Sequence, residues 1–147
     1  MKWDFLHIRL GEKCPISFDF INRFINVSIS LEDYLSNPLM KQVITYDKDK
    51  IVGLRIFKIL EDKIHLTYTA VDIPYRGCGI NHMMLEIIEG VARDLGIDTI
   101  TSNVRVSNMA SLRSLEKSGF ISIPNQNLTY SNGEEKIPHI KKLIYNL

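Results

Sequence analysis

Residues 71–84 read VDIPYRGCGINHMM, a segment that joins an apolar run to an amphipathic pattern. The apolar run ends at Asp72, and Gly77 and Gly79 stand directly before the first apolar residue of the pattern. Glycine lets a ligand approach the backbone closely, and the first turn of a helix carries unpaired N–H groups at a positive dipole end. With Arg76 beside them, these residues predict either an anion site suited to a phosphate or a plain tight turn.

The segment after the glycines is the clearest element of the sequence. Apolar residues recur at helical spacing over residues 80–95, which predicts a helix with one buried face. Before it, residues 41–47, 51–60 and 64–72 read as strands joined by short charged turns, so an antiparallel meander is expected. Residues 97–104 read as the next strand, and a strand on each side of a helix requires one parallel pair.

The two ends of the chain complete the predicted order of elements. The further predictions are a strand at residues 3–10, helices at 14–28, 30–40 and 107–119, and strands at 120–126 and 139–147. Asn37-Pro38 ends the second helix, and Asn132-Gly133 marks a hairpin before the last strand. The predicted class is α+β, with a mixed, mostly antiparallel central sheet of about seven strands flanked by about four helices. We expect residues 1–147 to form a single domain.

Composition and charge exclude several kinds of partner. The formal net charge is +1, so we expect no nucleic-acid partner and no anionic membrane surface. No apolar run approaches the roughly 20 residues that a membrane span needs. Cys14 and Cys78 are the only cysteines and fit neither a disulfide framework nor a metal-ligand pattern, which predicts a cytoplasmic protein without a metal.

Three phosphate-containing ligands are common at a glycine turn before a helix: a nucleoside triphosphate, a dinucleotide and coenzyme A. A nucleoside triphosphate site of the P-loop type needs Gly-Lys-Ser/Thr, whereas the corresponding run here is Gly79-Ile80-Asn81, which argues against it. A dinucleotide fingerprint needs three glycines in a tight turn, whereas two are present and the intervening DIPYR is too long. The third ligand is coenzyme A, for which the sequence resembles a known family.

The segment VDIPYRGCGIN resembles motif A of the GNAT family of N-acetyltransferases, whose core is Arg/Gln-x-x-Gly-x-Gly/Ala. Asn81 stands at the last small position of that core. NMASLRSLEKSGF, at residues 108–120, is similar to the motif B of ribosomal-protein-type N-acetyltransferases. The matching residues of motif B are Asn108, Ala110, Ser111, Arg113, Leu115, Glu116, Lys117, Gly119 and Phe120.

The resemblance implies that acetyl-CoA is a co-substrate held largely by the backbone. In the family, the strand before the glycine loop splays from its neighbour, and its free backbone groups hold the pantetheine arm. The loop amides then hold the pyrophosphate, and the helix that follows the next strand, here residues 107–119, adds side-chain contacts. The implied cofactor-binding residues are Thr69, Ala70, Val71, Arg76, Gly77, Cys78, Gly79, Ile80, Asn81, Asn108 and Lys117.

The resemblance also implies a catalytic set, in which this chain departs from the family twice. A backbone N–H near Val71 is expected to stabilise the oxyanion, and Asn108 is expected to hydrogen-bond the cofactor. Thr67 stands where the family often has a glutamate base, and Leu115 stands where many members have a tyrosine acid.

Substitute acid and base groups come from nearby strands. His65 is the base that we favour, because its intrinsic pKa suits the role, and Asn103 acting through a water is the alternative. Tyr68 and Tyr130 are the candidate acids. Strict alternation along the strand places His65 on the same face as Thr67, Thr69 and Val71, with Tyr68 on the other face.

The expected function is transfer of an acetyl group from acetyl-CoA to a primary amine by direct attack in a ternary complex. The amine belongs to a small molecule or a protein, and a homodimer remains open. The alternative is a non-catalytic domain on the same fold that senses CoA or serves protein contacts.

Overall fold

The computed structural model describes residues 6–105, 107–123, 128–129 and 133–143. The helices are α1 (Pro15–Asn22), α2 (Leu31–Ser36), α3 (Ile80–Asp94) and α4 (Met109–Lys117), with a 3-10 turn, η1, at Ile73–Tyr75. The strands are β1 (Leu6–Leu10), β2 (Met40–Asp47), β3 (Lys50–Ile59), β4 (Ile64–Val71), β5 (Thr99–Arg105), β6 (Ile121–Ser122), β7 (Leu128–Thr129) and β8 (Glu135–Lys142).

The strands form one mixed sheet, mostly antiparallel, in the order β1-β2-β3-β4-β5-β8-β6, with β7 paired to β8. The predicted meander is confirmed, because β2, β3 and β4 pair as antiparallel neighbours. The expected parallel pair is confirmed as well, and it joins β4 to β5 on either side of α3. The α+β class is therefore correct, with 8 strands in the described residues instead of about seven.

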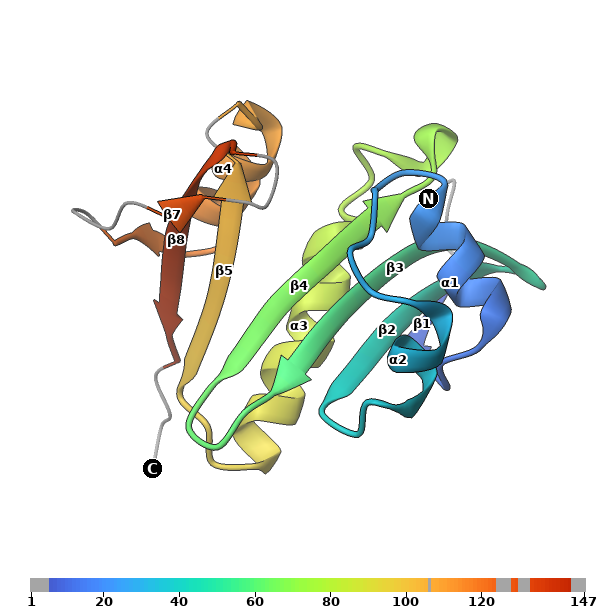
Figure 1. Ribbon diagram of the computed structural model, residues 1–147, viewed down its shortest axis with the longest axis horizontal. Coiled ribbons are helices and arrows are strands. Elements are labelled where there is room, and N and C mark those ends of the chain that lie inside the picture. Colours follow the sequence, from blue (N-terminus) through green and yellow to red (C-terminus); the bar gives the residue numbers. More distant parts are fainter. Residues whose placement is uncertain (1–5, 106, 124–127, 130–132, 144–147) are drawn as a thin grey trace.

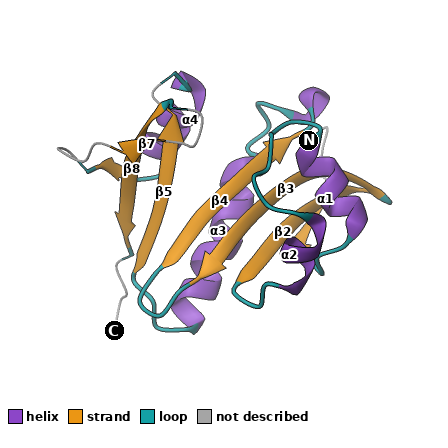
Figure 2. Cartoon of the chain, viewed as in Figure 1, coloured by secondary structure: helices purple, strands orange, loops and turns teal. Residues whose placement is uncertain are grey.

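Helices cover both faces of the sheet (Figure 1). On one face α3 packs across β1 to β4, and its buried residues Met84 and Ile88 share a core with Leu115 of α4. On the other face α1 and α2 supply Phe20 and Tyr34 to a second core over β2 to β4. The sheet thus separates a face covered by α3 from a face covered by α1 and α2 (Figure 2).

An ion pair connects α3 to the second half of the sheet. Lys141 of β8 lies 2.6 Å from the carboxylate of Glu89, and both side chains are largely buried. Arg93, one turn further along α3, lies 3.8 Å from the same carboxylate. The Lys141–Glu89 pair connects the end of β8 to α3, although β4 and β5 pair only from Ile64 to Leu66.

Several predicted boundaries need correction, among them the second helix, which ends at Ser36 instead of residue 40. α1 ends at Asn22 instead of residue 28, because the following run of Asn and β-branched residues favours a helix poorly, although Ile25 and Val27 still pack on the core. The last strand begins at Glu135 instead of residue 139 and ends at Lys142, and residues 144–147 of the predicted strand lie outside the described residues. β7 is a two-residue strand that no predicted element covers. Asn132 of the predicted hairpin lies outside the described residues, whereas Gly133 has a positive φ of 87°.

Candidate cofactor-binding and active site

The candidate site begins where β4 and β5 part. The two strands pair only from Ile64 to Leu66, opposite Ile100 to Ser102, and they diverge beyond this point (Figure 1). A β-bulge lies at the same level, since Tyr68 and Leu66 face consecutive residues of β3 and Thr67 is left over. A bulge bends its strand and increases the local twist. The result is a fork that is closed at Leu66 and open toward the end of β4.

The backbone of β4 presents free groups to this fork. The N–H of Asp72 donates to the carbonyl of Val52 on β3, at 2.8 Å. Because alternate residues of an antiparallel strand turn their polar groups to the same neighbour, Ala70 also faces β3. Thr69 and Val71 therefore turn their N–H and C=O groups to the opposite side, into the space that β5 has vacated.

The glycine loop lies at the open end of the fork, between η1 and α3 (Figure 2). Gly77 and Gly79 have φ of 79° and 82°, a left-handed conformation that side chains rarely adopt. A Cβ at either position would meet no atom within 4 Å, so both glycines border open space. Gly79 is also the N-cap of α3 and has no side chain to occupy the first-turn N–H groups. The loop therefore fits a phosphate group held by backbone donors.

Two contacts anchor the loop to the rest of the sheet. Tyr75 is buried, and its hydroxyl donates to the carboxylate of Asp47 at the end of β2. Asp72 accepts from the N–H of Ile73, and its carboxylate lies 3.6 Å from the ammonium of Lys50. The loop geometry is thus determined by residues of the β2–β3 turn as well as by its own glycines.

Arg76 lies at the mouth of the fork. Its Nε donates to the carbonyl of Val71 at 2.8 Å, and its guanidinium lies 5.8 Å from the ring centre of Phe24, after α1. The contact occupies the carbonyl that Val71 turns into the fork and leaves the N–H of Val71 to other acceptors. Arg76 therefore connects the end of β4 to the segment that follows α1.

Asn81 turns its side chain back toward the sheet. Its Oδ1 accepts a hydrogen bond from the hydroxyl of Thr69 at 3.0 Å and another from Nη1 of Arg55 at 2.5 Å. The side chain of Asn81 is thereby held away from the two glycines. The sequence patterns did not single out Arg55, although a lone arginine within the apolar run IVGLRIFKIL is a signal that could have identified it.

The bulge at Thr67 interrupts the alternation along β4, so His65 does not lie on the same face as Thr69 and Val71. The prediction from strict alternation is therefore wrong. Ile64 and Leu66 belong to the core under α3, so His65 between them points to the other face. After the extra residue Thr67, Tyr68 and Ala70 contribute to the core under α1 and α2. His65 therefore shares its face with Tyr68, while Thr69 and Val71 lie on the α3 side.

His65 itself sits at the closed end of the fork. One ring nitrogen, Nδ1, lies 2.7 Å from the hydroxyl of Thr101 on β5. Burial, followed by the charges of Lys63, Lys58 and Lys136, lowers the pKa of His65 below its usual 6.5. The imidazole is consequently neutral at pH 7 and able to accept a proton. Asn103 lies two residues beyond Thr101, at the level where the fork opens.

We expect the lowered pKa of His65 to make the folded state less stable in acid. The unfolded chain binds this proton more tightly, so the free energy of unfolding falls as the pH drops below about 6.5. The limit for one proton is about 1.4 kcal/mol for each pH unit crossed. Urea melts at pH 7.5 and 5.5 measure the loss, and His65→Gln should reduce it. A His65→Gln variant with the same acid loss as the wild type would contradict this account.

The two departures from the family motif have structural roles. The hydroxyl of Thr67 donates to the carbonyl of Ile56 at 2.9 Å, which holds the bulge against β3. Leu115 is buried in the core beneath α4. Neither side chain supplies an acid or a base. Tyr68 places its hydroxyl 3.1 Å from that of Ser28, and Tyr130 lies outside the described residues.

The remaining predicted residues lie around the loop and on α4. Ile80 is buried and offers only its backbone, and Cys78 is partly buried, with its thiol 3.7 Å from the carbonyl of Arg76. Asn108 is the N-cap of α4, and its Oδ1 accepts from the N–H of Ser111 at 3.1 Å. Lys117 is exposed in the last turn of the same helix.

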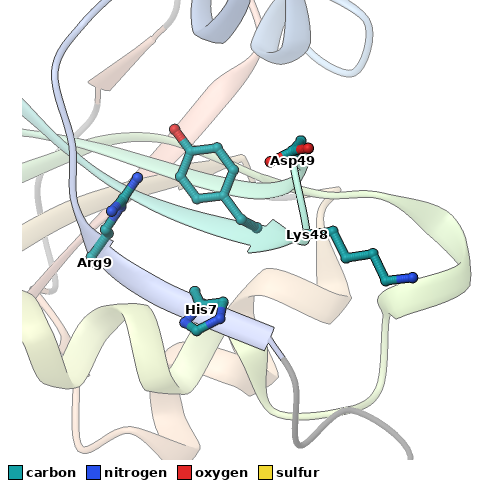
Figure 3. A pocket seen from close by; sticks show the side chains of 5 residues that line it. His7, Arg9, Lys48 and Asp49 are labelled. Carbon is teal, nitrogen blue, oxygen red and sulfur yellow. The ribbon is translucent and has the colours of Figure 1, made fainter.

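A hollow of about 340 Å³ lies elsewhere, beside β1 and the β2–β3 turn (Figure 3). His7, Arg9, Tyr46, Lys48 and Asp49 line it. Figure 3 shows Lys48 extending away from Arg9, and the guanidinium of Arg9 lies 5.1 Å from the ring centre of Tyr46. The cationic side chains around the hollow do not converge on one point, and none of the predicted site residues lines the hollow.

Comparison with known proteins agrees with this arrangement. The profile of the acetyltransferase (GNAT) family matches residues 13–120. No curated protein matches the chain significantly. The ribosomal-protein-S18-alanine N-acetyltransferase of Escherichia coli superposes with a TM-score of 0.80 at 21% identity, over 97% of this chain and 96% of that one.

Three further solved structures contain acetyl-CoA or CoA. A GNAT acetyltransferase from Elizabethkingia anophelis with acetyl-CoA bound gives a TM-score of 0.75 at 15% identity, over 95% of this chain and 99% of its own. A Bacillus subtilis acetyltransferase in complex with CoA gives a TM-score of 0.76 at 16% identity, over 95% of this chain and 99% of that one. The NatC complex, solved with Gag peptide and CoA, contains a chain that gives 0.78 at 19% identity, over 95% of this chain and 99% of that one.

The family match spans well over half of the chain, so the chain belongs to the acetyltransferase (GNAT) family. It is accordingly an N-acetyltransferase by family. None of the helices in the described residues is long and apolar enough to span a bilayer. The same residues contain no group of three or more His, Cys, Asp and Glu side chains arranged to hold a metal ion.

Proposed function

We propose that the chain transfers an acetyl group from acetyl-CoA to a primary amine by direct attack in a ternary complex. The observation that carries the proposal is the fork, in which the backbone groups of Thr69 and the N–H of Val71, which β3 does not use, lead to the glycine loop at the start of α3. An extended pantetheine arm fits beside a strand that has lost its neighbour. A pyrophosphate fits donors at a helix N-terminus.

The proposed cofactor contacts follow the order of the chain. Thr69, Ala70 and Val71 line the arm, and the amides of residues 77–81 hold the pyrophosphate. Arg76 supplies a positive charge at the mouth of the fork, and Asn108 and Lys117 approach from α4. We give Ile80 and Cys78 a role through their backbone alone, because Ile80 is buried and the thiol of Cys78 lies against Arg76.

The proposed chemistry needs one oxyanion donor and one proton acceptor. The amine nitrogen attacks the thioester carbonyl, a C–N bond forms, and the C–S bond then breaks. The N–H of Val71, turned into the fork, stabilises the negative charge on the carbonyl oxygen. His65, which its environment keeps neutral, lies six residues before Val71 at the closed end of the fork, so it accepts the proton that the amine loses through a chain of waters along the fork. The departing thiolate takes up a proton to give CoA.

A second candidate function is a CoA sensor without catalysis. The observation in its favour is that Thr67 and Leu115 are committed to the bulge and the core, at the positions where the family places an acid or a base. The sensor would use the same fork and loop. It differs from the enzyme only in that bound acetyl-CoA is not consumed.

The acceptor that we propose is a small-molecule amine or a protein amine, encountered in the cytoplasm. Both cysteines are free, which agrees with a reducing compartment. The near-neutral net charge of +1 supports neither a nucleic-acid nor a membrane partner. A homodimer remains compatible with the proposal.

Thermal melting with and without ligands tests the proposal. Acetyl-CoA at 100 times its Kd should stabilise the fold by about 2.7 kcal/mol, whereas NAD and ATP should not. Thiol release is then followed with peptides that have free N-termini and with small amines. Stabilisation without thiol release from any of them would favour the sensor, and no stabilisation at millimolar acetyl-CoA would exclude both functions.

A further inference from the structure

A buried guanidinium lies beneath the first turn of α3. Arg55, in the middle of β3, is 5% exposed, and its Nη1 donates to Oδ1 of Asn81 at 2.5 Å and reaches the carbonyl of Asn81 at 3.4 Å. Its neighbours Leu54 and Ile56 belong to the core under α1 and α2, so Arg55 points to the α3 face. The positive charge thus lies inside the protein, directly under the glycine loop.

This charge has no counter-ion in the structure. Within residues 6–105, 107–123, 128–129 and 133–143, no carboxylate comes within ion-pair distance of Arg55. Its Nε is buried without a hydrogen-bond partner. Burial lowers the pKa of Arg55 to about 10, so the guanidinium remains charged at neutral pH. A buried cation without a counter-ion is costly even when neutral oxygens accept its hydrogen bonds, which points to a ligand as the source of the missing negative charge.

The contacts of Arg55 connect this charge to the residue that departs from the family motif. Asn81 replaces the small residue at the end of the glycine core, and a longer side chain there could occupy the space of a phosphate. Arg55 and Thr69 together hold its Oδ1 against the sheet. The space beside Gly77 and Gly79 stays open as a result.

We propose that Arg55 is a positioning residue for the phosphates of the coenzyme: it holds Asn81 out of the cradle and places a buried positive charge beneath it. This role rests on the proposed function and makes the site selective for the phosphorylated part of the coenzyme over its pantetheine arm. Arg55 acts from below α3 through Asn81 and through its field, while the loop amides make the direct contacts.

The test compares two probes on two variants. In Arg55→Met, acetyl-CoA should bind about tenfold more weakly, the order expected for losing one charge near a multiply charged group in a partly desolvated site. Acetyl-pantetheine, which carries no phosphate, should bind within about twofold of the wild type, because the arm site is unchanged. Arg93→Met removes the same charge from the other end of α3 and should leave both affinities unchanged.

Arg55→Lys serves as a second variant that keeps the charge, and it should bind acetyl-CoA within about threefold of the wild type. Equal losses for the two probes in Arg55→Met would reduce Arg55 to a structural role and overturn the proposal. So would unchanged acetyl-CoA affinity, or a tenfold loss in Arg55→Lys. If the wild-type chain binds acetyl-pantetheine and acetyl-CoA equally, the role of Arg55 is overturned but the proposed function stands. If it binds neither probe, the proposed function is overturned together with the role of Arg55.

Discussion

Replacement of Gly79 by valine should weaken acetyl-CoA binding at least 100-fold while leaving the chain folded. The φ of Gly79 is 82°, and a Cβ there would project into the open space that we assign to the pyrophosphate. The left-handed conformation costs a side chain roughly 1–2 kcal/mol, so a fall of a few degrees in Tm is expected. Titration calorimetry with acetyl-CoA measures the affinity, and a thermal melt reports the fold.

Gly96 provides a matched control for this substitution. It has a φ of 71°, follows the other end of α3, and also borders open space. Gly96→Val should therefore lose a similar amount of stability and no affinity for acetyl-CoA. Equal losses of affinity in the two variants would show that the effect comes from strain on α3, and the assignment of the loop to the pyrophosphate would be wrong.

Replacement of Val71 by proline should lower kcat about 100- to 1000-fold, the usual effect of removing one oxyanion donor. Proline removes the N–H that Val71 turns into the fork, and β3 does not use this group. The strand should tolerate proline because the N–H of residue 71 points into the fork, so no hydrogen bond between β4 and β3 is lost. Thiol release, with an acceptor that the amine panel identifies, measures kcat.

Val71→Ala is the control, since it keeps the N–H and shortens only the side chain. We expect its kcat to stay within about threefold of the wild type, as oxyanion stabilisation depends on the donor. If alanine and proline slow the reaction equally, the side chain of Val71 is responsible and the backbone donor is not. A proline variant of undiminished kcat would remove Val71 from the catalytic set.

Local patterns in the sequence predicted the cofactor end of the site. Gly77 and Gly79 form the tight turn that their position before α3 suggested, and both have a positive φ, because a turn of this kind depends on a few adjacent residues. The helix itself was readable from its apolar spacing, which covers four turns and ends close to the predicted residue.

The other half of the site depends on contacts between strands, which spacing alone does not reveal. The bulge at Thr67 inverts the faces of β4, and no residue in IHLTYTAV marks where the extra residue falls. His65 was therefore assigned to the wrong face. The role of Arg55 is equally non-local, because its partner Asn81 lies 26 residues away.

An amide NMR titration with CoA tests the central claim most directly. We predict that the amide chemical shifts of Thr69, Val71, Gly77 and Gly79 change with CoA concentration along one common saturation curve. Arg9 and Lys48, beside the separate hollow, should remain unperturbed. Shifts confined to Arg9, Lys48 and their neighbours, with the fork and the glycine loop unchanged, would contradict the account.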